Sequence, residues 1–124
     1  MMGVFKVIIA GGRQFSDYEL LKAKCDLFLQ QKRVTHSIII VSGTARGADS
    51  LGERYAHERG YAVEKYPADW EQHGKAAGPI RNAEMAENAD ALIAFWDGQS
   101  KGTKSMINIA KTKGLGVRVI SYTI

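Results

Sequence analysis

Continuous apolar runs alternate with amphipathic segments along the whole chain. Consecutive apolar residues are typical of strands buried on both faces of a parallel sheet, whereas apolar residues at helical spacing indicate helices that cover such a sheet. The predicted strands are residues 5–10, 37–41, 62–66, 90–96 and 117–121. The predicted helices are residues 17–32, 48–59, 79–88 and 103–113. This alternation predicts an α/β fold, a three-layer Rossmann-like domain with a mainly parallel five-stranded sheet and right-handed crossovers.

Glycine and proline mark several of the predicted boundaries. Gly60 and Gly114 follow two of the predicted helices, and glycine commonly ends a helix. Pro79 suits the first turn of a helix, where a missing N–H costs nothing. Residues 67–78 are expected to form a long polar loop. No repeat, linker or low-complexity tract interrupts the pattern, so we expect one domain over residues 1–124.

Composition and charge restrict the class of protein, its location and its possible ligands. The chain has 124 residues, of which 45% are hydrophobic, enough to bury a core without disulfides or a structural metal. The single cysteine, Cys25, permits no internal disulfide and is expected in the core. No apolar run approaches the roughly 20 residues of a membrane span, and the amino terminus lacks signal-peptide order. We therefore expect a cytoplasmic location and no membrane partner. The net charge of +4 suits an anionic ligand but is too small to indicate nucleic-acid binding.

The predicted sheet directs attention to the loops that follow its strands, because open parallel sheets bind ligands beyond the carboxyl ends of their strands. These loops are residues 11–16, 42–49, 67–82 and 97–103. They contain eight of the 13 glycines, which permit close approach of the backbone to a ligand. Tight turns also use glycine, so both explanations remain open for each position.

The loop at residues 42–47 (SGTARG) has the form of an anion site. It follows an apolar strand and opens a helix, so its N–H groups and the helix dipole favour a phosphate. The hydroxyls of Ser42 and Thr44 and the guanidinium of Arg46 would add donors. Asp49, in the first helical turn, either caps the helix or accepts hydrogen bonds from ribose hydroxyls.

Two common phosphate motifs are disfavoured. Residues 11–16 (GRQFS after the first glycine) lack the G-x-G-x-x-G pattern of dinucleotide-binding dehydrogenases. Residues 98–105 (GQSKGTKS) differ from the Walker A pattern at Thr103, where a side chain stands in place of a glycine that wraps the phosphates. The sequence thus predicts neither an NAD dehydrogenase nor a P-loop NTPase.

Other chemistry is less well supported. Trp70 lies in the long polar loop and is a candidate for stacking on a base. The histidines at positions 36, 57 and 73 are too widely spaced to suggest a zinc site, so no metal is predicted.

Three segments and one tripeptide carry a family resemblance. Residues 42–49 (SGTARGAD), 78–85 (GPIRNAEM) and 89–98 (ADALIAFWDG), followed by KGT at 101–103, resemble the YspA/YpsA-related branch of the SLOG superfamily. The likeness covers nearly the whole chain. It implies a Rossmann-like protein of bacterial or phage origin that binds a nucleotide-related ligand. Relatives include LOG phosphoribohydrolases, which release a base from a nucleoside monophosphate, the DNA-processing protein DprA, and sensor domains of prokaryotic defence systems.

The resemblance to LOG enzymes is stronger in the binding half of their site. Their Arg-Lys-x-x-Met segment resembles residues 81–85, where Arg81 is retained and Asn82 replaces the lysine. Their phosphate-binding Gly-Thr resembles Gly102 and Thr103. The resemblance therefore implies that phosphate binding is preserved.

The acidic residue of the LOG site is missing. Met106 takes its position, and a thioether neither accepts a proton nor stabilises an oxocarbenium ion. Glu84, Asp49 and Asp97 are weak candidates for a replacement acid. The sequence alone identifies no catalytic residue.

We therefore expect a binding or sensor module for a phosphorylated nucleoside or an ADP-ribose or NAD derivative, with no certain cofactor. A LOG-like hydrolase is the alternative. Single-strand nucleic-acid binding, as in DprA, is a third and less favoured function, because basic residues form no run and aromatic residues are not interleaved with them. The family also suggests a homodimer. The expected ligand-binding residues are Gly11, Gly12, Arg13, Ser42, Gly43, Thr44, Arg46, Gly47, Asp49, Trp70, Arg81, Asn82, Gly102 and Thr103.

Overall fold

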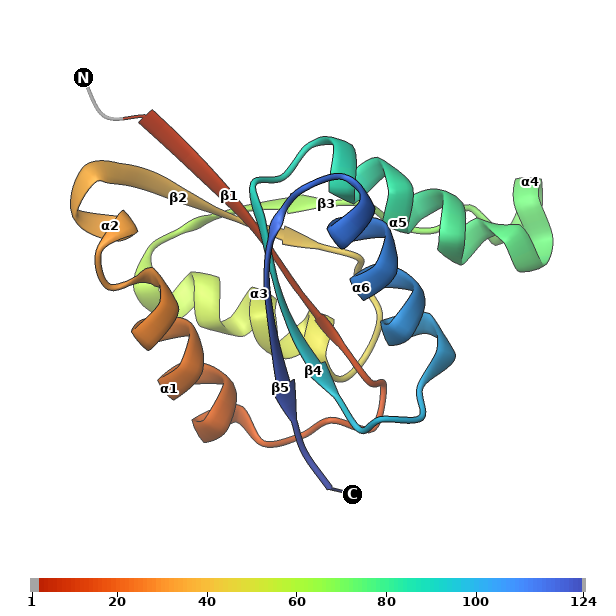
Figure 1. Cartoon of the computed structure of the whole chain (residues 1–124), viewed down its shortest axis with the longest axis horizontal. Coiled ribbons are helices and arrows are strands. Elements are labelled where there is room, and N and C mark those ends of the chain that lie inside the picture. Colours follow the sequence, from red (N-terminus) through yellow and green to blue (C-terminus); the bar gives the residue numbers. More distant parts are fainter. Residues whose placement is uncertain (1–2, 124) are drawn as a thin grey trace.

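The computed structural model describes residues 3–123 and confirms the predicted fold class (Figure 1). Five strands form one parallel sheet in the order β3-β2-β1-β4-β5. The strands are β1 (Gly3–Gly11), β2 (His36–Ser42), β3 (Ala62–Lys65), β4 (Ala91–Trp96) and β5 (Gly116–Ser121). The main helices are α1 (Tyr18–Leu29), α3 (Ala48–Arg59), α5 (Ala77–Glu87) and α6 (Lys101–Thr112).

Helices cover the sheet on both faces, which makes three layers (Figure 1). On one face α1 and α3 pack their apolar side chains, among them Leu21 and Tyr55, against Ile9 and Phe95 of the sheet. On the other face α5 and α6 pack against alternate strand residues such as Ile8. The central strands β1, β2 and β4 are therefore apolar on both sides, which explains their continuous apolar runs. The cysteine of α1 is fully buried in the first of these cores, as predicted.

The connections change direction at β1. From β1 the chain passes through α1 and α3 to β2 and β3, and it then returns through α5 to β4 on the other side of β1. The loops that follow β1 and β4 consequently leave toward opposite faces of the sheet. This divergence is the topological switch point at which parallel α/β sheets bind ligands.

The expected loop at residues 67–78 is partly helical, so that prediction is wrong in its extent. It contains α4 (Trp70–His73) and a 3-10 turn, η1 (Gly74–Ala76), before α5 begins at Ala77. The carboxylate of Asp69 accepts a hydrogen bond from the Gln72 amide at 3.1 Å and so caps α4. Pro79 lies in the first turn of α5, as predicted.

The first predicted helix is also divided. It ends at Leu29, and a short separate helix, α2 (Lys32–Thr35), precedes β2. No helix within residues 3–123 has the length and apolar character needed to cross a bilayer.

Candidate functional site

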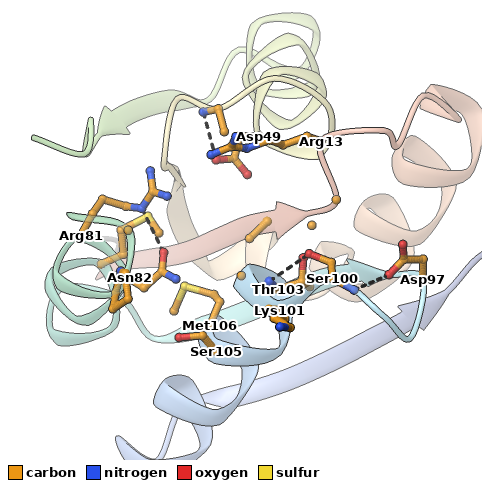
Figure 2. Close-up of a pocket in the computed structure, with 18 of the residues that line it drawn as sticks. Arg13, Asp49, Arg81, Asn82, Asp97, Ser100, Lys101, Thr103, Ser105 and Met106 are labelled. Atoms are coloured by element: carbon orange, nitrogen blue, oxygen red, sulfur yellow. Dashed lines mark hydrogen bonds between the residues drawn. The ribbon is translucent and has the colours of Figure 1, made fainter. Parts of the chain in front are cut away.

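A cavity of about 500 Å³ opens at the carboxyl ends of β1 and β4, where the chain changes direction. Its wall is formed by the end of β1 and by the first turns of α3, α5 and α6, and Figure 2 shows their polar side chains around one open space. The predicted ligand residues that line it are Gly11, Gly12, Arg13, Asp49, Trp70, Arg81, Asn82, Gly102 and Thr103. Three others, Gly43, Thr44 and Arg46, line an adjoining hollow.

The β1 end of the cavity is built by close contacts between backbones. The Gly12 carbonyl accepts hydrogen bonds from the amides of Phe15 and Ala48, which tie the loop after β1 to the start of α3. Gly47 has φ +80°, and a Cβ there would lie 2.3 Å from the Gly12 carbonyl oxygen. A Cβ on Gly11 would lie 2.4 Å from the Phe95 carbonyl oxygen. These glycines are thus explained by packing within the protein.

Ser42 does not face the cavity, which corrects its assignment as a ligand donor. Its side chain is buried, and its hydroxyl donates to the Glu53 carboxylate at 2.6 Å. The same oxygen accepts a hydrogen bond from the Thr44 amide at 3.1 Å. Ser42 therefore fixes the shape of the loop at residues 43–47, and Gly47 lines neither hollow.

Asp49 is a buried carboxylate that faces the cavity, with only 6% of its surface exposed. It accepts a hydrogen bond from the Ala45 amide at 3.2 Å, and α3 begins after Gly47 without a side-chain cap, so the capping interpretation is wrong (Figure 2). Burial raises the pKa of Asp49 to about 6, although the Ala45 N–H and the nearby Arg81 favour the charged form. Asp49 can accept hydrogen bonds from a ligand hydroxyl or exchange a proton near neutral pH.

Arg81 connects α5 to the loop after β2. Its Nη1 donates a short hydrogen bond to the Gly43 carbonyl, and its Nε donates to the Asn82 side chain at 2.9 Å. A Cβ on Gly43 would lie 2.7 Å from both the Arg81 Nη1 and the Asp49 carboxylate, so the glycine allows both groups to approach. Burial lowers the pKa of Arg81, but the guanidinium stays charged at any physiological pH. Its remaining N–H groups are available to the cavity.

The opposite wall is the amino-terminal turn of α6. Ser100 is the N-cap, and its hydroxyl accepts from the Thr103 amide at 3.3 Å. Asp97 accepts from the amides of Gln99 and Ser100, and these bonds lower the pKa of its carboxyl. The Trp96 indole donates to the Ser100 carbonyl at 3.1 Å. The loop is therefore fixed by its own side chains, and within residues 3–123 the amides of residues 101 and 102 have no partner.

Gly102 differs from the glycines at the β1 end. It lines the cavity in the first turn of α6, and a Cβ there would meet no atom within 4 Å. Its φ lies outside the left-handed region, so neither conformation nor packing requires glycine. Glycine in a helix costs roughly 0.5–1 kcal/mol relative to alanine. The protein thus leaves an uncovered backbone facing the cavity where a side chain would fit.

The three candidates for a replacement acid lie in different environments. Glu84 is exposed on α5 and does not line the cavity, so it is not a replacement acid in this arrangement. Asp97 lines the cavity, but two loop amides donate to its Oδ1 and lower the pKa of its carboxyl, which disfavours the protonated form that a general acid needs. Asp49 is the remaining one, on the opposite side from Met106, which is buried in the cavity wall.

Several lining residues escaped the sequence analysis, among them Ser100, Lys101, Ser105 and Tyr122. Ser100 had a usable signal, since serine is among the residues preferred as an N-cap and it stands just before the predicted helix. Tyr122 had none, because it reaches the cavity from beyond β5. Its hydroxyl is buried without a hydrogen-bond partner in the described part of the chain.

Comparisons with known proteins support the fold at two levels. The fold resembles DNA processing protein A (DprA) from Streptococcus pneumoniae with a TM-score of 0.73 at 17% identity, over 98% of this chain and 52% of that one. It resembles the structural-genomics target TM1055 with a TM-score of 0.61 at 21% identity, over 94% of this chain and 72% of that one. The chain therefore spans about half the length of the DprA protein.

Sequence comparisons are more specific. The gene 61 protein of Mycobacterium phage D29 is 37% identical over 119 residues, which cover 90% of this chain and 93% of the phage protein. The model of the YspA, cpYpsA-related SLOG family matches residues 5–73, more than half of the sequence. The family model covers more than half of the sequence and includes the motif at residues 42–49, so the chain belongs to the YspA, cpYpsA-related SLOG family.

Proposed function

We propose that the chain binds a phosphorylated nucleoside or a related nucleotide derivative in the cavity at the carboxyl ends of β1 and β4. It would act as a binding or sensor module. The observation that carries the proposal is the first turn of α6. There Gly102 leaves the backbone uncovered, and the amides of Lys101 and Gly102 point to no partner within residues 3–123. Free N–H groups at the positive end of a helix dipole favour a phosphate.

The surrounding charges fit an anion at this position. Lys101 and Arg81 both line the cavity, and a guanidinium with free N–H groups forms charge-assisted bonds to phosphate oxygens. Asp49 lies across the cavity, where it can accept hydrogen bonds from ribose hydroxyls. Trp70 is 52% exposed and lines the mouth, so its indole can cover a base.

A nucleotide panel tests the proposal. Titration calorimetry and thermal unfolding are carried out with the ribonucleoside 5′-monophosphates, ADP-ribose and NAD. We expect at least one of them to raise the unfolding temperature progressively with its concentration. Absence of any response at millimolar concentration would overturn the proposal.

The Gly102→Ala variant ties binding to α6. A methyl group there has room in the protein and favours the helix, so stability should rise by up to about 1 kcal/mol. The same methyl group obstructs the approach of a phosphate, so affinity should fall at least 10-fold. Lys104→Ala, on the exposed side of α6 and outside the cavity, is the matched control and should leave affinity unchanged. Unchanged affinity in Gly102→Ala would contradict a phosphate at this turn.

Hydrolysis of the N-glycosidic bond is the second candidate, and the buried Asp49 is the observation that favours it. Its pKa of about 6 is near the value suited to a general acid or base at neutral pH. Chromatography of nucleoside monophosphates incubated with the protein distinguishes the two functions, because a sensor leaves the ligand intact. Release of free base that is abolished in Asp49→Asn would establish the hydrolase.

A further inference from the structure

A second hollow, also of about 500 Å³, adjoins the proposed nucleotide cavity. We call it the arginine groove, because Arg13, Arg46 and Arg81 line it together with Thr44 and Trp70. Both Arg13 and Arg81 also line the cavity, as does Trp70. The two hollows therefore meet along shared side chains, and each has a volume in the range that accepts a drug-sized ligand.

The charged side chains that line the groove are all positive. None of the residues that line the groove is acidic, and none of its three arginines forms a salt bridge within residues 3–123. Burial lowers the pKa of Arg81, the Asp49 carboxylate partly offsets this effect, and the positive charge of Arg13 adds to the lowering. Asp49 lines the cavity but not the groove, so the groove lining itself contains no carboxylate. An anion in the groove would supply the negative charge that this lining lacks.

The groove wall is fixed rather than loose. Thr44 has φ +64°, an uncommon conformation for a β-branched residue, and its amide donates to the Ser42 hydroxyl. Arg81 donates to the Gly43 carbonyl one residue earlier. The two bonds hold the loop in the shape that directs residues 44–46 along the groove. A loop backbone that is already held in one shape lowers the entropic cost of binding.

We propose that the ligand carries two separated phosphate groups, one at the start of α6 and the other in the arginine groove. A molecule with two phosphate-bearing halves, of the dinucleotide class, fits the paired hollows, and Trp70 lies where it borders both halves. This inference rests on the proposed function and specifies its ligand. A single nucleic-acid strand presents a similar series of phosphates, and the experiment separates this source from a small dinucleotide.

The experiment measures affinities of the whole chain by calorimetry. Its probes are the ribonucleoside 5′-monophosphates, the matching dinucleotides with a 5′-phosphate, and single strands of about 12 nucleotides. We expect the best dinucleotide to bind at least 10-fold more tightly than its monophosphate. Arg46→Gln, which changes the groove but not the cavity, should lower dinucleotide affinity at least 10-fold more than monophosphate affinity.

Two further variants complete the test. Lys101→Gln changes the cavity alone and should weaken both ligands alike. Arg33→Gln removes the same charge from the exposed surface of α2, away from both hollows, and should weaken neither. If monophosphates bind but dinucleotides bind no more tightly, and Arg46→Gln changes nothing, the inference fails while the proposed function stands. If no probe binds, both fail. A strand that binds more tightly than every dinucleotide, with loss in Arg46→Gln, overturns the small-molecule ligand in favour of nucleic acid.

Discussion

Two glycine-bearing loops border the cavity, and they use their polar atoms in opposite ways. In the loop at residues 42–47, the Ser42 hydroxyl, the Gly43 carbonyl and the Ala45 amide are bonded to residues outside the loop, and the Thr44 amide donates to the Ser42 hydroxyl within it. In the loop at residues 97–103, the Asp97 carboxylate accepts from the amides of Gln99 and Ser100, and the next two amides have no partner in the described chain. Similar residue types thus build a scaffold in one loop and a donor surface in the other.

The difference shows that a glycine-rich turn before a helix does not by itself identify a phosphate loop. Ser42 and Gly47 serve the packing between β1, β2 and α3, and this packing places Asp49 and Arg81 at the cavity. Gly102 serves no packing within the protein. The two loops therefore predict opposite responses when their glycines are changed.

The largest expected effect is in Gly47→Ala. The residue has φ +80°, and the new Cβ would lie 2.3 Å from the Gly12 carbonyl oxygen, so the backbones must separate. We expect the free energy of unfolding to fall by about 3 kcal/mol or more. Urea denaturation measures this loss of stability as a lower transition midpoint.

Gly98→Ala is the matched control for that change. Gly98 has φ +85° in the other loop, but its Cβ would meet no atom within 4 Å. Only the conformational cost remains, roughly 1–2 kcal/mol. Equal losses in the two variants would show that the contact with Gly12 is unimportant and would remove the scaffold argument.

The second effect is a gain of stability in Asp49→Asn. The pKa of Asp49 rises from an ordinary value of 3.8 to about 6, so the folded state binds a proton more tightly than the unfolded state. As the pH rises through about 4 to 6, Asp49 ionises in the unfolded chain before it ionises in the folded protein, so the free energy of unfolding falls. Above pH 6 the charged carboxylate destabilises the fold. At pH 7.5 the variant should be more stable by on the order of 2–3 kcal/mol, with equal stabilities near pH 3.5.

Denaturation curves over this pH range measure the difference between Asp49→Asn and the original chain. A constant difference would show that Asp49 titrates normally. Loss of nucleotide affinity together with gained stability would indicate that the buried carboxylate is retained for the ligand.

Arg81→Ala should weaken nucleotide binding by about 1.5–3 kcal/mol, which corresponds to roughly 10- to 150-fold. It should also lower stability by about 1 kcal/mol, because the Gly43 carbonyl loses its donor. Calorimetry and urea denaturation measure the two effects separately. Arg33→Ala on the exposed surface of α2 should change neither quantity. A large loss of stability with unchanged affinity for the folded protein would make Arg81 a scaffold residue only.

The smallest expected effect concerns Met106. The unmodified protein should release little or no base from nucleoside monophosphates, because the acid of the LOG-like pattern is absent. Met106→Glu restores the acid. The side chains around this position are arranged for a buried thioether and not for a carboxylate, so we expect at most weak release of base. Robust release by the unmodified chain would contradict the sensor function.

The fold was predictable because its signal is local. Each buried strand is a continuous apolar run, and each helix has its own periodicity, so the layer architecture follows from the sequence. The sheet edge that holds the cavity follows from the same alternation. The helix α4 was missed because its four residues have no periodicity, although Asp69 offered a capping signal.

The arrangement of the site was less predictable because it depends on distant pairs. The bond between Arg81 and the Gly43 carbonyl spans 38 positions, and composition gives no sign of it. The Ser42 hydroxyl can donate to a ligand, as the sequence suggested, but in the fold it donates to Glu53 of α3 instead. Residue type indicated which groups lie near the sheet edge, and three-dimensional packing decides which of them face the cavity.

A titration followed by amide NMR tests the central claim most directly. Nucleoside 5′-monophosphates are added to the labelled chain, and the amide signals of Lys101, Gly102 and Thr103 are followed to saturation. The account predicts large saturable shifts at these amides, with small changes in α2. Saturable binding that leaves the three amides unmoved would contradict a phosphate site at the start of α6.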